Sequence, residues 1–200
     1  MNTKTAQEPL FIAKDRAMDI IEPHYGRLEG SVRDGWADWE ALPPKQRVKL
    51  NGRARASCLY DFIIDHVRRR FADVPNITFF ERRGLFMLGI DGLVTLRFKK
   101  LRYGKKTSNI QTTQQMNIFG RQLDLPGVPK AARLTVGYML DVSQSFIKSV
   151  LVTLQMGNEV MWDFSLSTSQ QTLAFPDSKQ QQEAQVNVKT KAPLKKTSDS

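Results

Sequence analysis

The spacing of apolar residues changes near residue 77, and this change constrains the fold more than any other feature of the sequence. Before it, apolar residues recur every three or four positions, as at Leu59, Phe62 and Ile63, which is the spacing of one face of an α-helix. After it, apolar and polar residues alternate, as in residues 93–103, which is the period of a strand with one packed face. The sequence therefore predicts an α+β fold with its helices at the N-terminus.

The helical part divides at its prolines. Residues 9–42 have helical periodicity that Pro23 interrupts, and a second helical stretch runs from about 45 to 72. Proline lacks a backbone N–H and clashes with the preceding turn, so it breaks or kinks a helix. A further helix is predicted within the later part of the chain, over residues 109–121.

The remaining ordered part reads as strands joined by tight turns. Asp91-Gly92 is a strong hairpin signal, because a type I′ turn needs positive φ at both central positions, and Gly157-Asn158 is a second such turn. The predicted strands lie near 77–81, 85–91, 93–103, 133–141, 147–156 and 159–166. We expect the N-terminal helices to pack on a mainly antiparallel sheet whose core contains Val94, Leu96, Phe98, Val136, Tyr138, Val152, Leu154, Trp162 and Phe164.

Composition divides the 200 residues into three parts. Residues 1–50 are an N-terminal helical segment and residues 51–166 are a basic α+β core. Residues 167–200 are rich in Ser, Thr, Gln and Lys with few apolar side chains. Such a segment cannot bury enough apolar surface to offset its conformational entropy, and we expect it to be a disordered tail.

The net charge is concentrated in one segment. The chain has 30 Lys and Arg against 20 Asp and Glu, a formal charge of +10. Residues 51–106 contain 13 basic and 5 acidic side chains, an excess of eight. A localised positive surface favours polyanionic partners such as DNA or RNA.

The basic segment supplies the candidate site. We predict that Arg97 and Lys99 form its centre, because they lie two residues apart on the strand face opposite Leu96 and Phe98. A basic run at the end of the preceding helix is predicted to contribute farther from the centre. That run also suits the helix dipole, which is its purely structural explanation. The predicted nucleic-acid-binding residues are Arg68, Arg69, Arg70, Arg97, Lys99, Lys100 and Arg102.

No familiar catalytic, metal or cofactor motif is present. The sequence lacks the phosphate-binding glycine loops, the His-Glu-x-x-His zinc motif and the Gly-x-Ser-x-Gly elbow,. Cys58 and His66 are eight residues apart on one helix, which is about 12 Å and too far for a nucleophilic pair, so we predict that both are packing residues. The sequence predicts no catalytic residue, no metal site and no cofactor.

Two resemblances are carried by residues of the core. The order of a helix, three strands, a helix and a strand resembles the core of restriction-endonuclease-like nucleases, but Arg97 stands where that family needs a metal-binding Glu, and a cation cannot bind Mg²⁺. This resemblance implies a core that kept anion binding and lost cleavage. Leu96–Leu101, Leu125–Pro129 and Arg133–Tyr138 resemble an uncharacterised bacterial family associated with toxin–antitoxin and mobile-element genes, which implies a context and no catalytic residues.

Three functions follow as hypotheses. The first is a nucleic-acid-binding protein without catalysis, possessing the basic surface described above. The second is an antitoxin-like or regulatory protein that docks an acidic protein partner. The third is a divergent metal-dependent nuclease built on Glu81, Asp91 and Lys99. A single cysteine and the lack of an apolar stretch approaching about 18 residues favour a cytoplasmic protein without a membrane partner.

Overall fold

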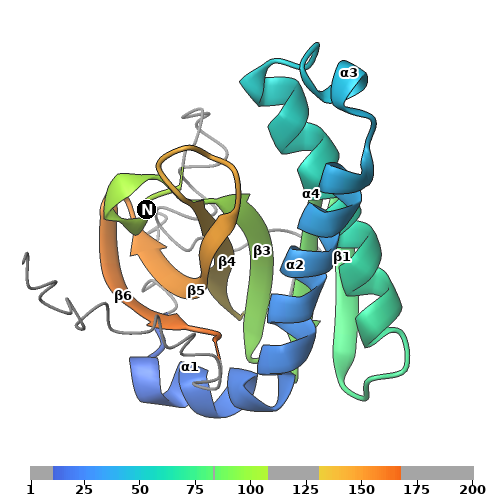
Figure 1. Ribbon diagram of the computed structural model, residues 1–200. Helices are drawn as coiled ribbons and strands as arrows, with labels where there is room; N and C mark the ends of the chain where they lie inside the picture. Colours follow the sequence, from blue (N-terminus) through green and yellow to red (C-terminus); the bar gives the residue numbers. More distant parts are fainter. Residues whose placement is uncertain (1–10, 83, 108–130, 168–200) are drawn as a thin grey trace, which may run out of the picture. The chain divides into compact units, whose positions relative to one another are not determined.

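The computed structural model describes residues 11–82, 84–107 and 131–167, and all of them belong to one compact unit (Figure 1). The helix predicted over 109–121 lies outside the described residues, as does the predicted tail from residue 168 onward. The described residues form N-terminal helices packed on a six-stranded, mostly antiparallel sheet. The predicted fold class is confirmed.

The helices follow the two predicted stretches, 9–42 and 45–72, except that residues 48–51 divide the second stretch into two helices. The helices are α1 (Lys14–Ile21), the short 3-10 helix η1 (Glu22–His24), α2 (Tyr25–Ala41), α3 (Pro44–Arg47) and α4 (Gly52–Phe71). Pro23 lies in η1 and separates α1 from α2. Asn51 caps α4, because its side-chain oxygen accepts a hydrogen bond from the backbone N–H of Ala54 at 2.9 Å,.

Helices α2 and α4 lie side by side against one face of the sheet (Figure 1). Gly35 makes their close approach possible, because a Cβ atom at this position would lie 2.7 Å from Cγ1 of Ile63 and 2.8 Å from its backbone nitrogen. Buried apolar side chains on both helices, including Val32, Trp36, Leu59 and Ile63, join one hydrophobic core with the sheet. The helices therefore hold a fixed position over the strands that they cover.

The six strands follow one another in the sheet in chain order. Neighbouring strands pair antiparallel except β3 and β4, which are parallel. The predicted hairpin turn is present, since Asp91 and Gly92 have φ values of 52° and 66°. The strands are β1 (Ile77–Arg82), β2 (Leu85–Ile90), β3 (Val94–Lys100), β4 (Ala132–Leu140), β5 (Ile147–Met156) and β6 (Glu159–Ser165).

The central strands of the sheet, β2 to β5, are buried on both faces. The face under the helices is apolar and holds the nine predicted core residues, eight of them buried. Trp162 is half-buried against this core and donates a hydrogen bond from Nε1 to the backbone oxygen of Ile12 at 3.0 Å. The opposite face holds buried polar side chains, among them Arg97, Arg133, Thr135, Thr153 and Gln155. An alternation of apolar and polar residues therefore does not mark a solvent-facing side in the centre of this sheet.

None of the helices in the described ranges combines the length and the apolar character needed to cross a membrane.

Candidate nucleic-acid interface

The basic run at the end of α4 is neutralised by carboxylates. Arg68 pairs with Glu81 of β1, Arg69 with Asp65 one turn earlier in α4, and Arg70 with Asp34 of α2. The Arg68 guanidinium also lies 4.8 Å from the ring centre of Phe86, within the range of a cation–π contact. Arg68 and Arg70 therefore link α4 to β1 and α2, and all three arginines present little uncompensated charge.

The second part of the predicted site is the pair Arg97 and Lys99 on β3. We expected this pair to face solvent, and it does not. Arg97 is 2% exposed, and it donates hydrogen bonds from Nε to the Thr135 hydroxyl at 2.8 Å and from a terminal nitrogen to the Thr107 hydroxyl at 3.4 Å. Burial lowers the pKa of Arg97 to about 10,. Desolvation, together with the charge of Arg97, also lowers the pKa of half-buried Lys99. A buried guanidinium cannot reach a phosphate in solvent, so Arg97 is not the centre of an exposed surface.

Lys100 and Arg102 lie in a different environment, at the end of β3 near the start of α4. Strand alternation puts Lys100 on the helix side of the sheet, with Leu96 and Phe98,. Its Nζ donates a hydrogen bond to Oε1 of Gln144 at 3.0 Å, and Arg55 of α4 donates to the same oxygen at 3.3 Å. Because the side-chain nitrogens of Lys100 and Arg55 both hydrogen-bond to one oxygen atom, they lie close together. A single phosphate group can therefore contact both.

We call Arg55, Lys100 and Arg102 the cation cluster. Desolvation lowers the pKa of Lys100, and the nearby positive charges of Arg55 and Arg102 lower it further,. Across the ranges that the structure covers, no carboxylate forms an ion pair with any of the three. The cluster therefore concentrates positive charge that no carboxylate of the described residues neutralises.

An open hollow of about 550 Å³ lies beside the cation cluster. Arg55 and Ser143–Ser145 line it, together with Arg47 at the end of α3 and the exposed Val48 that follows. Glu40 is the acidic side chain in this lining, and no ion pair joins it to the cluster among the described residues. The charged side chains in its lining are Arg47, Arg55 and Glu40, and this small excess of positive charge suits an anionic chain,.

The loop between β4 and β5 is fixed by Asp141, and it positions Gln144. The Asp141 carboxylate accepts hydrogen bonds from the backbone N–H groups of Ser143, Ser145 and Phe146 and from the Ser143 hydroxyl. Although desolvation opposes the effect, these hydrogen bonds lower the pKa of Asp141 to about 2. The ionised carboxylate holds the loop in place, and Gln144 in turn connects Arg55 to Lys100.

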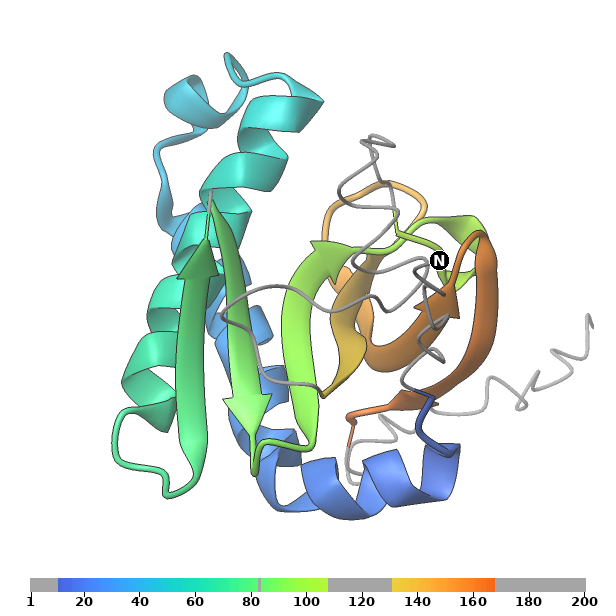
Figure 2. The same cartoon turned by 180° about the vertical axis from the view of Figure 1, so that it is seen from behind.

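The two halves of the predicted site lie at opposite ends of α4. Figure 2 shows the start of α4 and the end of β3 at the same end of the sheet, and the end of α4 at the other. Arg55 and Arg69 are 14 positions apart on one helix, which corresponds to about 21 Å. The structure therefore unites Lys100 and Arg102 with Arg55 and does not bring them to Arg68, Arg69 and Arg70.

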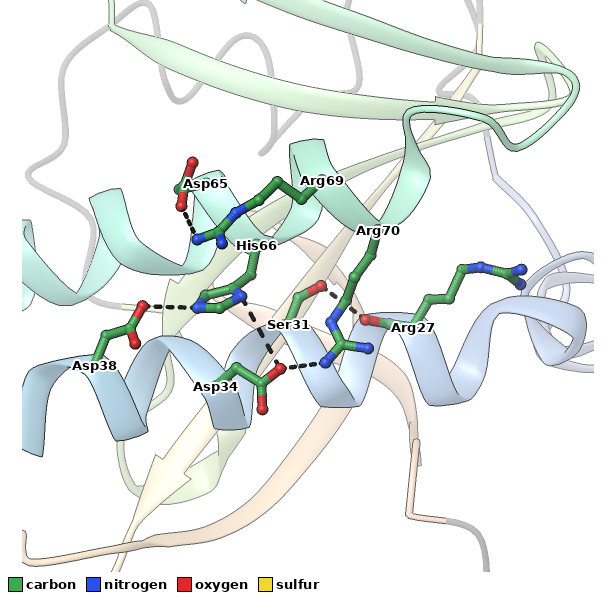
Figure 3. Close-up of polar contacts among 8 residues, drawn as sticks. All are labelled: Arg27, Ser31, Asp34, Asp38, Asp65, His66, Arg69 and Arg70. Carbon is green, nitrogen blue, oxygen red and sulfur yellow. Dashed lines mark hydrogen bonds and ion pairs between the residues drawn. The ribbon is translucent and has the colours of Figure 1, made fainter.

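A polar cluster joins α2 and α4 near the paired arginines (Figure 3). Nε2 of His66 lies 2.7 Å from Oδ2 of Asp38, and its Nδ1 lies 4.0 Å from Oδ2 of Asp34, which also pairs with Arg70. His66 was predicted to be a packing residue; its ring is mostly buried, but its contacts are polar. These contacts connect the two helices, and they do not include a hydroxyl or thiol hydrogen-bonded to His66 within the part of the chain described.

The residues of the nuclease hypothesis lie apart. Glu81 is on the helix side of the sheet, where it pairs with Arg68, and Asp91 is in the β2–β3 turn. Lys99 lies on the other face, five positions beyond the first residue of β3, or about 16 Å along the strand,. No group of three or more potential metal ligands occurs among the described residues.

The sequence analysis did not assign two residues to the site: Arg55 of the cation cluster, and Gln144, which links Arg55 to Lys100. Arg55 belongs to the basic segment, but nothing in its helical surroundings distinguishes it from Arg53. Gln144 lies some 44 positions beyond Lys100 in the chain, and its role depends on a tertiary contact. The Asp-x-Ser-x-Ser pattern of residues 141–145 is the one available signal, since an Asp side chain that accepts hydrogen bonds from the following backbone N–H groups is typical of a structured turn.

Comparisons of this chain with models of protein families, with curated proteins and with solved structures found no match.

Proposed function

We propose that this protein binds nucleic acid without catalysis, and that the cation cluster is where it contacts the phosphate backbone. The observation that carries the proposal is the gathering of Arg55, Lys100 and Arg102 with no ion-paired carboxylate from residues 11–82, 84–107 or 131–167. Like charges held together repel one another, and a bound polyanion relieves that repulsion while releasing its own counterions. Burial of the cations is incomplete, so phosphate groups can reach them from solvent.

The arrangement around the cluster supports the same function. The Gln144 carbonyl oxygen accepts hydrogen bonds from Arg55 and Lys100, and so aligns both donors before any ligand arrives. Because the loop that carries Gln144 is itself fixed by Asp141, little side-chain freedom remains to be lost on binding. Contacts to phosphate carry no base identity, so we expect affinity that varies little with sequence and falls steeply with salt.

The test compares two double variants that remove the same charge from opposite ends of α4. Arg55→Ala with Lys100→Ala removes two cations from the cluster, and Arg69→Ala with Arg70→Ala removes two that are already paired. Fluorescence anisotropy with labelled DNA and RNA at about 50 mM salt measures the affinity. Loss of one phosphate contact costs roughly tenfold at this salt concentration, so the first variant should bind about 100-fold more weakly and the second within about twofold of the parent.

The matched control separates a site from a net-charge effect. Equal losses in the two variants would show that overall charge, and not the cation cluster, drives binding, and would contradict the proposal. If the parent protein binds neither DNA nor RNA at low salt, nucleic-acid binding is wrong, and co-purification of an acidic protein that survives nuclease treatment would favour the protein-partner hypothesis instead.

A further inference from the structure

Two large aromatic side chains remain in solvent beside the cation cluster. Tyr103 directly follows Arg102 and is 100% exposed, and Phe146 lies two positions after Gln144 and is 56% exposed. Two positions next to the cation cluster therefore hold aromatic rings that the described residues leave largely unburied. Exposed aromatic rings beside cations are the composition of surfaces that bind unpaired bases.

The backbone under Tyr103 is held in one conformation. Tyr103 begins the 3-10 helix η2 (Tyr103–Lys105), whose Gly104 and Lys105 both have positive φ. Arg102 and Lys106 are joined by a backbone hydrogen bond of 2.8 Å, and the Lys105 ammonium pairs with Asp163 of β6 at 2.7 Å. The ring therefore projects from a tight, anchored turn.

The backbone at Phe146 is fixed in the same way. Its N–H donates a hydrogen bond to the Asp141 carboxylate at 3.0 Å, and its carbonyl oxygen accepts one from the Asp141 N–H at 3.1 Å. Phe146 is the residue immediately before β5. Both aromatic residues thus stand on ordered backbone, and a base that stacks on either ring does not have to order the chain beneath it.

We propose that the ligand of the cation cluster is single-stranded nucleic acid, with Tyr103 and Phe146 supplying faces on which unpaired bases stack. This inference rests on the proposed function and specifies its ligand. In a duplex the bases are stacked on one another and only phosphates and groove edges face the protein, so exposed rings gain little there. In a single strand each base has a free π-face, and stacking on an aromatic side chain adds to the phosphate contacts without requiring a particular sequence.

The experiment measures affinity for a labelled single-stranded oligonucleotide of about 20 nucleotides and for its duplex, under the same salt conditions. The variants are Tyr103→Ala and Phe146→Ala. Stacking of one base on an aromatic side chain is worth a factor of roughly 5 to 150 in affinity, so each variant should lose that factor for the single strand and stay within about twofold of the parent for the duplex. The parent should prefer the single strand.

Two controls separate ring stacking from other effects. Tyr103→Phe keeps the ring and should bind as the parent does, and Val142→Ala truncates a fully exposed, non-aromatic side chain in the same loop as Phe146 and should change nothing. Because these side chains are exposed, all four variants should keep the melting temperature of the parent.

The outcomes distinguish this inference from the proposed function. If the parent binds duplex and single strand equally and neither alanine variant weakens binding, the stacking inference is wrong while the cation cluster still binds nucleic acid. If Tyr103→Phe loses as much affinity as Tyr103→Ala, a hydroxyl contact and not stacking is responsible. If the parent binds neither ligand, the proposed function itself is wrong.

Discussion

The two ends of α4 carry similar basic residues in opposite electrostatic states. At the C-terminal end, Arg68, Arg69 and Arg70 each have a carboxylate partner, from β1, from α4 itself and from α2. At the N-terminal end, Arg55 shares an amide oxygen with Lys100 and no carboxylate among the described residues pairs with it. Basic residues of one helix therefore form structural ion pairs at its C-terminal end and a candidate anion-binding site at its N-terminal end.

The same contrast recurs within β3. Arg97 and Lys100 are three positions apart, so they point to opposite faces of the sheet. Arg97 is buried among threonine hydroxyls, and Lys100 reaches the helix side at the open end of the strand. Charge counted along a chain is thus a poor measure of charge available to a partner, because burial and pairing decide how much of it is presented.

The largest effect should come from reversing the buried charge of β3. Arg97→Glu places a carboxylate where a guanidinium now donates hydrogen bonds, and disrupting a buried ionic group costs at least about 3 kcal/mol. Lys100→Glu, at the C-terminal end of β3, should change the free energy of unfolding by no more than about 0.5 kcal/mol. Urea unfolding of the two variants measures the difference, and similar losses in both would show that the two faces of β3 are not distinct in the way described.

An intermediate effect is expected when the paired arginines are released. Asp34→Asn, Asp65→Asn and Glu81→Gln together remove the carboxylates that neutralise the end of α4. The freed arginines should then attract polyanions, so we expect nucleic-acid affinity at low salt to rise roughly threefold to tenfold, with a steeper dependence on salt.

The control for this gain is a triple variant with the same change in net charge. Asp15→Asn, Asp19→Asn and Glu22→Gln neutralise exposed carboxylates of α1 and η1, which pair with no cation in the described ranges. An equal rise in affinity for the two triple variants would mean that net charge alone matters. It would contradict the claim that the two ends of α4 differ in the charge they present to a ligand.

The smallest effect concerns the loop that holds Gln144. The pKa of Asp141 is about 2 in the folded protein, below its ordinary value of 3.8, so the ionised carboxylate contributes stability above pH 3.8 that is lost as the pH falls through about 2. NMR titration of the Asp141 carboxyl carbon should give this low midpoint, and the amide signals of Ser145 and Phe146 should follow the same curve. A midpoint near 3.8 would show that the loop is not fixed by this carboxylate.

Most of the secondary structure could be predicted because it depends on local patterns. Alternation of apolar residues identified the strands from β2 to β6 to within one residue, except that β3 ends at Lys100, three residues before the predicted end. The Asp91-Gly92 turn has the positive φ values that its sequence requires. The parallel pairing of β3 with β4 had no such signal, since the direction of two paired strands depends on the connection between them.

The candidate site was predicted only in part, for the same physical reason. Lys100 and Arg102 were named from the sequence. The structure joins Lys100 to Arg55 through Gln144, a residue far along the chain, and the charge of Arg102 acts on Lys100 from nearby. Arg97 was expected at the centre of the site because strand alternation places it opposite the apolar face of β3. Alternation does not say whether that second face meets solvent. Arg97 is 2% exposed, and this burial arises only when the sheet packs.

The sequence by itself determined the order of helices and strands, the apolar face of each and the segment in which positive charge accumulates, because periodicity, turn residues and composition act over a few neighbouring positions. Only the tertiary structure decided which cations keep their charge available. Ion pairs such as Arg70 with Asp34, and shared acceptors such as Gln144 for Arg55 and Lys100, join residues that are 36 to 89 positions apart. Electrostatic pairing depends on distance in space and on burial, and both are fixed only when α2, α4 and the sheet pack together.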